Sequence, residues 1–257
     1  MADHLLRDDR NGVRTLTLNR PEKRNPLSLA LMRDLCSALD ETALETTISV
    51  VVVRGNGPAF SAGHDLGEVR GASLASMREL FRECSELMLR VHRLPQPVIA
   101  AVDGIATAAG CQLVAACDLA IATDRSTFAT PGVKIGLFCS TPMVETSRVI
   151  GRKRALEMLL TGDPIDAATA LQWGLVNDVV ASSRLDEAVA ALSARLARSS
   201  SQTLAVGKRA FSEQLDLPLP AAYDHAMEVM AQNAVARDAQ EGIGAFLDKR
   251  APVWEGR

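Results

Sequence analysis

Apolar runs that end in turns of small residues and lead into helical patterns constrain this chain most. Residues 48–53 and 97–102 are two such runs, and both are too apolar for surface strands. Helical patterns cover residues 73–94 and 107–117, after the turns. Strands that alternate with helices in this way pair in parallel and carry their helices on the outside. The sequence therefore predicts an α/β fold.

After Gly151 the chain becomes predominantly helical. Further helices are expected at residues 154–161, 166–173, 185–198, 202–215, 220–237 and 239–249, with one strand at residues 176–180. The last helices have wide apolar faces, which either close the core of the same chain or pack against a second subunit. We favour the second and expect two regions: a core at residues 1–198 and an oligomerisation region at residues 199–257.

Composition argues against several classes of function. The 28 Lys and Arg against 31 Asp and Glu give a net charge of −3, which disfavours nucleic-acid binding. The longest apolar stretch, residues 98–122, contains Asp103 and Asp118, so no membrane association is expected. Five cysteines without a CxxC pair, and no apolar signal core in residues 1–13, indicate the cytoplasm. The four histidines lack ligand spacing, so no metal is expected.

Two of the small-residue turns are candidates for anion binding. They read FSAGHDL at residues 60–66 and AAGCQL at residues 108–113. Gly63 allows a positive φ, and the alanines leave room for a ligand against the backbone. The N–H groups of His64 and Ala109 would open helices, where the first N–H groups have no internal partner. Taken alone, each turn is ordinary; if both converge, they make an oxyanion hole for an enolate or a tetrahedral thioester anion.

The side chains of the first turn have more than one interpretation. The His64 ring is either an acid–base group or a packed ring whose residue matters only through its N–H, and we favour the packed ring. Asp65 is expected to cap the helix that follows. Ser61, His64 and Asp65 lie within one turn and make no convincing catalytic triad.

Several motifs of the chain occur together in one known family. They are LNRP at residues 18–21, GPAFSAGHDL at 57–66, PVIAAVDG at 97–104, GCQL at 110–113, TPGV at 130–133 and LLTG at 159–162. Through them nearly the whole chain resembles the enoyl-CoA hydratase/isomerase (crotonase) family, and within it a subgroup of enoyl-CoA hydratase domain-containing proteins. The resemblance implies a spiral of ββα units with a C-terminal helical trimerisation region, assembled as homotrimers or dimers of trimers.

The resemblance also implies a coenzyme A thioester as ligand, with the coenzyme as part of the substrate and no permanently bound cofactor. By this resemblance, the N–H groups of His64 and Ala109 correspond to the oxyanion donors of the family. The backbone of Ala62 carries over to adenine recognition, and Asp65 and Leu66 complete that coenzyme-binding motif.

Two basic residues outside that turn carry over as coenzyme contacts. Arg24 lies near the family's basic phosphate contact. Lys249 matches a C-terminal lysine that reaches the coenzyme of a neighbouring subunit.

The chain departs from the family pattern at the acid–base pair. Hydratases of the family carry one glutamate in Gly-x-Cys-Glu-Leu and another in a Pro-Glu pair, and those positions hold Gln112 and Gly132 here. Glutamine can orient a water but cannot take its proton at neutral pH, and glycine offers no side chain. Downstream, Glu145 is either a replacement base or a surface or structural charge, and we favour the charge.

Three functions are therefore weighed. The first is a lyase of fatty acid metabolism, nominally an enoyl-CoA hydratase, which uses an oxyanion hole to stabilise a thioester enolate. The second is an acyl-CoA decarboxylase, because the loss of carbon dioxide creates the enolate without a basic carboxylate. The third is a catalytically inactive acyl-CoA binder.

Overall fold

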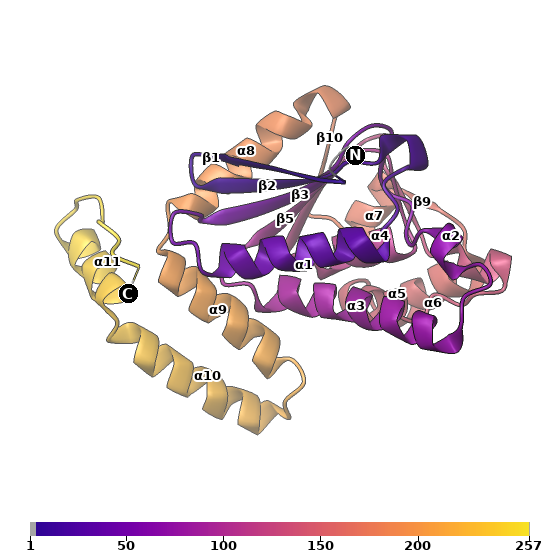
Figure 1. The fold of residues 1–257 in the computed structure, drawn as a ribbon. Helices are drawn as coiled ribbons and strands as arrows, with labels where there is room; N and C mark the ends of the chain where they lie inside the picture. Colours follow the sequence, from indigo (N-terminus) through magenta and orange to yellow (C-terminus); the bar gives the residue numbers. More distant parts are fainter. Residues whose placement is uncertain (1–3, 257) are drawn as a thin grey trace.

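Two sheets organise residues 4–256, the part of the chain that the computed structural model describes. In these residues a six-stranded sheet has the order β1-β2-β3-β5-β7-β10, and a four-stranded sheet has the order β4-β6-β8-β9. Figure 1 shows β1, β2, β3 and β5 of the large sheet side by side. The strands are β1 (Leu5–Arg10), β2 (Val13–Leu18), β3 (Val50–Gly55), β4 (Ala59–Ser61), β5 (Val98–Val102), β6 (Ile105–Thr107), β7 (Leu119–Thr123), β8 (Thr127–Ala129), β9 (Ile165–Asp166) and β10 (Asp178–Val180).

Helices cover the sheets and continue beyond them to the C-terminal end. They are α1 (Leu29–Ala43), α2 (Leu66–Val69), α3 (Leu74–Arg93), α4 (Ala109–Ala116), α5 (Pro142–Val149), α6 (Arg152–Thr161), α7 (Ala167–Trp173), α8 (Leu185–Ala197), α9 (Ser201–Gln214), α10 (Leu219–Ala234) and α11 (Arg237–Leu247). The side chains of Ser28 and Ser73 accept the N–H groups of Leu31 and Ser76, which fixes where α1 and α3 begin.

Consecutive strands alternate between the two sheets. β3, β5 and β7 join the large sheet, whereas β4, β6 and β8, which directly follow them, join the small one. A helical segment comes after each pair: α2 and α3, then α4, then α5 beyond a 3-10 turn. The chain thus repeats a ββα unit, and the predicted α/β architecture is confirmed.

The centre of the large sheet is parallel and buried on both faces. β2, β3, β5, β7 and β10 pair in parallel. Val51 and Val53 of β3 face the core under α1 and α3, whereas Val50 and Val52 face α8. Burial on both faces explains why this strand is a continuous valine run rather than an alternating pattern.

Some strands differ from the sequence expectation. No strand was expected before β2, but β1 lies there and pairs antiparallel with β2. Residues 1–3 of this stretch lie outside the described part. The side chains of β1 are mostly exposed, so no apolar alternation marks it. The short strands of the small sheet were also missed, since two or three residues cannot display a period of two.

The helix α9 is fastened to the sheet core by one lysine. Lys208 Nζ donates to the carbonyls of Val91 and Gln96 at 2.9 and 3.1 Å, and it lies 2.6 Å from the carboxylate of Asp118. Burial raises the pKa of Asp118, and the charge of Lys208 opposes that rise. The Asp118 side chain is 25% exposed, and its contact with Lys208 fixes where the C-terminal helices leave the core.

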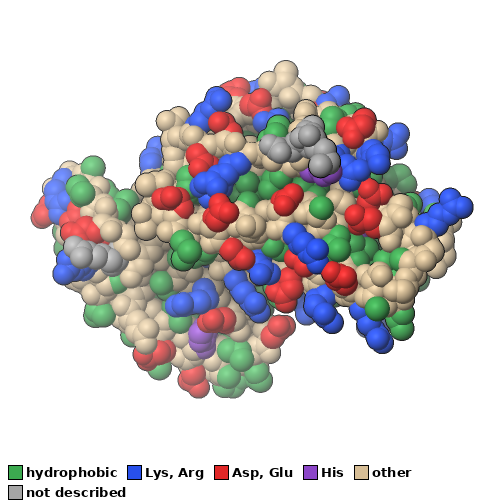
Figure 2. Space-filling view, viewed as in Figure 1, with side chains coloured by type: hydrophobic (Ala, Val, Ile, Leu, Met, Phe, Trp, Pro, Cys, Tyr) green, Lys and Arg blue, Asp and Glu red, His purple; other side chains and the backbone are tan. Residues whose placement is uncertain are grey.

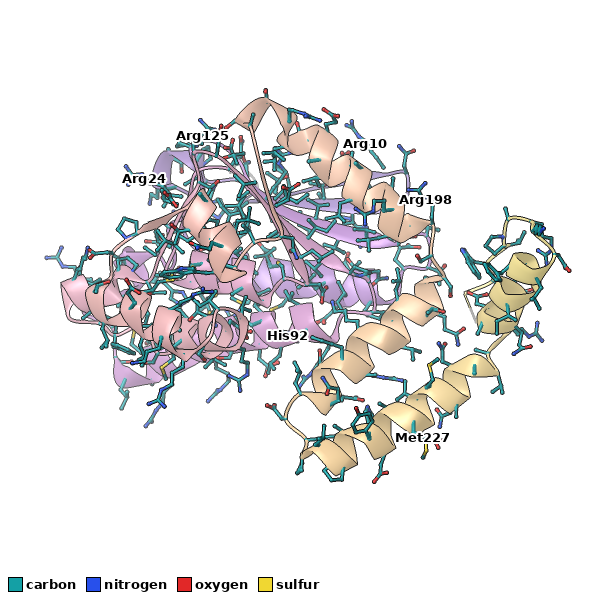
Figure 3. The ribbon with its side chains drawn as sticks, turned by 180° about the vertical axis from the view of Figure 1, so that it is seen from behind. Arg10, Arg24, His92, Arg125, Arg198 and Met227 are labelled. Carbon is teal, nitrogen blue, oxygen red and sulfur yellow. The ribbon has the colours of Figure 1, made fainter. Side chains whose placement is uncertain are left out.

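The helices α10 and α11 project from the body of the molecule, and Figure 3 places Met227 on α10, away from the sheets. Leu219, Tyr223, Met227 and Met230 of α10 recur at helical spacing and are 65–71% exposed. One face of α10 is therefore apolar and uncovered by its own chain. The division of the chain at residue 198 remains a prediction. Across residues 4–256, every helix is too short or too polar to span a bilayer.

Candidate active site

Three neighbouring strand ends define one edge of the small sheet. β4 pairs in parallel with β6, and β6 with β8, so their carboxyl ends lie at the same edge. The chain leaves these ends through the segments that carry His64, Ala109 and Gly132. Residues that the sequence separates by more than 20 positions are thus brought to one edge. In open α/β sheets this is the edge where ligands bind.

The turns that follow β4 and β6 are in direct contact. A Cβ on Gly63 would lie 2.8 Å from the Cβ of Ala108 and 3.2 Å from the backbone nitrogen of Ala109. Gly63 has φ +88° and Ala108 has φ +50°, a left-handed conformation that is strained for alanine. Such strain costs about 1–3 kcal/mol and concentrates at functional sites. Only glycine fits at position 63 while the turns stay this close.

One N–H group in each of the two turns, that of His64 and that of Ala109, has no partner among the described residues. Leu27 pairs with His64 in a parallel bridge, and the bridge uses the carbonyl of Gly63, 2.7 Å from the Leu27 nitrogen. Ala109 is the first residue of α4, and the preceding N–H, of Ala108, donates to the carbonyl of Ala129. Within residues 4–256 the N–H groups of His64 and Ala109 make no hydrogen bond. Two donors beside each other suit an oxyanion.

The His64 ring is packed inside the protein. Its Nδ1 lies 3.3 Å from the carbonyl oxygen of Leu27, and its plane meets the Phe81 ring edge-on at a centroid distance of 5.4 Å. Burial lowers the pKa of His64, although the Leu27 carbonyl acts in the opposite direction. The ring is therefore neutral at neutral pH.

Gly132 is enclosed by backbone. It belongs to the 3-10 helix η2 (Pro131–Ile135), and its carbonyl accepts the N–H of Leu137 at 2.9 Å. A Cβ at this position would lie 2.0 Å from the carbonyl oxygen of Leu137 and 2.8 Å from the sulfur of Cys139. The first contact is with backbone, which cannot rotate away. Any side chain here, a glutamate included, requires the segment around Leu137 to move.

Gln112 is buried in α4 and faces α3. The thiol of Cys84 lies 3.7 Å from its Oε1. Burial raises the pKa of Cys84 to about 12, so this thiol stays protonated and acts as the donor. An amide in this setting can donate or accept a hydrogen bond but cannot exchange a proton with a substrate at neutral pH.

Glu145 already has a partner within the protein. It is buried on α5 and pairs with Nε2 of His92 at 3.0 Å. Burial raises the pKa of Cys117, the residue directly after α4, and the charges of Asp118 and Glu145 raise it further. Ala109 lies at the other end of that helix, about 12 Å away for eight residues. This placement favours a structural charge over a replacement base.

The residues carried over to coenzyme binding gather around the first turn. The carbonyl of Arg24 accepts the N–H of Ala62 at 2.9 Å, and Figure 3 shows Arg24 at the outer rim of the core. Asp65 caps α2 as expected, by accepting the N–H of Gly67 at 3.0 Å. Leu66 begins α2 and is 56% exposed.

Lys249 lies apart from these residues in its own chain. It follows α11, which stands on the opposite side of the molecule from α2 (Figure 1). A contact between this lysine and a ligand at the two turns therefore needs a second copy of the chain.

Two polar residues behind the first turn were not singled out from the sequence. The buried Asn25 has φ +52°, and its amide donates to the carbonyls of Asn56 and Ala59. Arg20 forms an ion pair with Asp65 at 3.1 Å. They hold the start of β4 and the cap of α2. The only signal was the LNRP motif, which contains Arg20 and indicated family resemblance but no contact.

The comparisons with known proteins agree with this geometry. The model of the family "Enoyl-CoA hydratase/isomerase" matches residues 8–257. The chain belongs to this family. Enoyl-CoA hydratase domain-containing protein 3, mitochondrial, of Danio rerio is 47% identical over 97% of this chain and 86% of its own length. 2,3-Dehydroadipyl-CoA hydratase of Escherichia coli is 36% identical over 95% of this chain and 96% of its own.

A solved family member has the same fold. The crystal structure of human enoyl-CoA hydratase domain-containing protein 3 superposes with a TM-score of 0.96, at 45% identity, over 98% of this chain and 100% of that one. The crotonase-like fold with C-terminal helices is thereby confirmed, as is the resemblance to enoyl-CoA hydratase domain-containing proteins.

The expectation of a cytoplasmic location is wrong. The Danio rerio relative, which matches 97% of this chain, is named as a mitochondrial protein. The expectation relied on unpaired cysteines, and all five are buried in the fold. Buried cysteines behave as small apolar side chains, so their number reports packing rather than compartment.

The enclosure of Gly132 gives a testable prediction. We expect Gly132→Ala to lower the free energy of unfolding by about 3 kcal/mol, because the new methyl group overlaps the Leu137 carbonyl. Gly207→Ala is the matched control: it lies in α9 with open space around it, and we expect a gain of about 0.4–1 kcal/mol. Urea unfolding measures both. Equal stability of the two variants would contradict the described packing.

Proposed function

We propose that this chain binds acyl-CoA thioesters where the turns after β4 and β6 meet, and that it stabilises a thioester enolate there. The observation that carries the proposal is the contact of Gly63 with Ala108 and Ala109. It sets the free N–H groups of His64 and Ala109 beside one another. Hydrogen bonds from both N–H groups stabilise the thioester oxygen most when it becomes an enolate oxygen, because it then carries negative charge.

The names of the family and of the relatives support enoyl-CoA chemistry in general. We infer the specific reaction from the residues at the acid–base positions. We propose that Gln112 and Gly132 occupy the places of the two family glutamates. Hydration needs a base for water and an acid for the α carbon. An amide bonded to Cys84 and a glycine enclosed by backbone supply neither.

Decarboxylation of a malonyl-type thioester fits the remaining groups. The bond between the α carbon and the carboxylate breaks, carbon dioxide leaves, and the electron pair passes to the thioester oxygen as an enolate. The two N–H groups hold that oxygen until water protonates the α carbon. No basic side chain is required in this sequence, so it agrees with a neutral His64 ring.

A binder without turnover is the second candidate. The contact between Gln112 and the thiol of Cys84 favours it, because the amide oxygen is then occupied within the protein rather than turned to a substrate. Both candidates use the same pocket for the coenzyme, and we propose the backbone of Ala62 for adenine, Asp65 and Leu66 beside it, and Arg24 for phosphate.

We propose further that the chain works as a trimer or a dimer of trimers. The uncovered apolar face of α10 supports assembly, since a face of this kind is stable in water when another chain covers it. Assembly also offers a route for Lys249 to reach the coenzyme bound by a neighbour. The site would then be complete only between chains.

A panel of three thioesters tests the reaction. We expect butyryl-CoA to bind, malonyl-CoA or methylmalonyl-CoA to lose carbon dioxide, and crotonyl-CoA to be hydrated at least about a hundredfold more slowly than by a glutamate-bearing member of the family. Gly63→Ala should lower decarboxylation about a hundredfold, because it separates the two donors. Calorimetry measures binding, and carbon dioxide release and the loss of enoyl absorbance measure turnover.

Gly71→Ala is the control for Gly63→Ala, because Gly71 has φ +71° but open space around it. Hydration of crotonyl-CoA at a rate normal for the family would contradict the proposed loss of acid–base chemistry. Binding without turnover of any thioester would leave the second candidate. If none of the thioesters binds, both are wrong.

A substitution in α10 tests the assembly. We expect the double variant Met227→Glu and Met230→Glu to sediment as a smaller species, because charge is costly inside an apolar interface. Leu44→Glu is the control, since Leu44 is 85% exposed directly after α1, far along the chain from this face. Analytical ultracentrifugation measures both; an unchanged species for the double variant would exclude this face of α10 from the interface.

A further inference from the structure

A groove on the surface of α3 lies outside every residue assigned so far. Its volume is about 540 Å³, and its lining is Leu74, Met77, Arg78, Phe81, Arg82 and Ser85. All six residues come from one helix, α3, where they recur at the spacing of one helical face. The groove is therefore a continuous strip along α3.

The groove lies next to the ring of His64. Phe81, which lines the groove, packs its ring against the ring of His64 at a centroid distance of 5.4 Å. The N–H of His64 is one of the two proposed donors for the thioester oxygen. On the proposed function, an acyl chain that passes the His64 ring on this side reaches Phe81 and the groove.

The charges of α3 are divided between its two sides. On the side toward α1, Glu79 and Glu83 pair with Arg33 at 2.6 and 3.7 Å. On the groove side stand Arg78 and Arg82, both exposed, and within residues 4–256 neither forms an ion pair or hydrogen bond. Figure 2 shows basic side chains along the lower right edge, where Figure 1 places this part of α3. The groove thus keeps two uncompensated positive charges.

The two arginines lie close together on α3, and the next residue at this spacing, Glu86, pairs with Arg90 at 3.0 Å. The two arginines of the groove stand four residues apart on one helix, a spacing at which like charges repel. Guanidinium groups bind carboxylates in a planar, two-pronged geometry. Leu74, Met77 and Phe81 give the same groove an apolar lining for methylene groups. The combination fits a ligand that is apolar along its length and anionic at its end.

We infer that the groove binds the acyl part of a thioester that ends in a carboxylate, so that the substrate class is dicarboxylyl-CoA, with Arg78 and Arg82 as the specificity-determining residues. This inference rests on the proposed binding of acyl-CoA thioesters at His64 and Ala109. It adds to that proposal by assigning the far end of the acyl chain to Arg78 and Arg82.

Matched pairs of thioesters test the inference by calorimetry on the full chain. Glutaryl-, adipyl- and suberyl-CoA are compared with valeryl-, hexanoyl- and octanoyl-CoA, which differ from them only in the terminal carboxylate. We expect the dicarboxylyl ester of at least one pair to bind about tenfold more tightly. This preference should shrink as salt is raised, because the groove is open to solvent.

Arg78→Gln and Arg82→Gln keep most of the side-chain length and remove the charge. Combined, they should abolish the preference and leave the binding of the monocarboxylyl esters within about twofold. Arg195→Ala is the control: Arg195 is an exposed arginine of α8 that should alter neither class.

The failures of the two proposals are distinguishable. Equal binding within every matched pair overturns the inference and leaves the acyl-CoA site intact. Equal weakening of both classes by the double variant also overturns it, because the arginines would then contact the coenzyme. If no ester of either class binds, the proposed function itself is wrong and the inference falls with it.

Discussion

The close approach of two turns is the constraint on which the rest of the site depends. β4 and β6 are parallel neighbours, so the turns after them leave the small sheet side by side. Gly63 and Ala108 then touch, and the backbone takes left-handed conformations at both positions. The same contact sets the N–H groups of His64 and Ala109 next to each other. The ββα repeat matters for function because it creates this pair of adjacent strand ends.

The surroundings of that pair limit which chemistry it can serve. In the proposed site, the enclosed Gly132 and the amide of Gln112 leave the two N–H donors without a carboxylate pair. The same small sheet that aligns the donors also aligns η2 with them, through the pairing of β6 and β8. A change of Gly132 alone therefore introduces no side chain unless the backbone at Leu137 also moves.

The sequence predicts the long elements well and the site only in part. β3 and β5 are recognisable as buried apolar runs, and Ser28 and Ser73 mark where α1 and α3 begin. The small sheet escaped notice because its strands are too short for a pattern. The two turns were found from their glycine and alanines, but their contact depends on strand pairing. Gly132 packs against the backbone carbonyl of Leu137, and the residue types in the sequence do not indicate a backbone contact of this kind.

The central claim is that the two N–H groups polarise a thioester carbonyl. Infrared difference spectroscopy on the complex with a saturated acyl-CoA, labelled with carbon-13 at the thioester carbonyl, tests it most directly. We expect the carbonyl stretch of the bound thioester to move to lower frequency than in water, and Gly63→Ala to remove that shift. A bound thioester whose carbonyl frequency equals that in water would contradict the account.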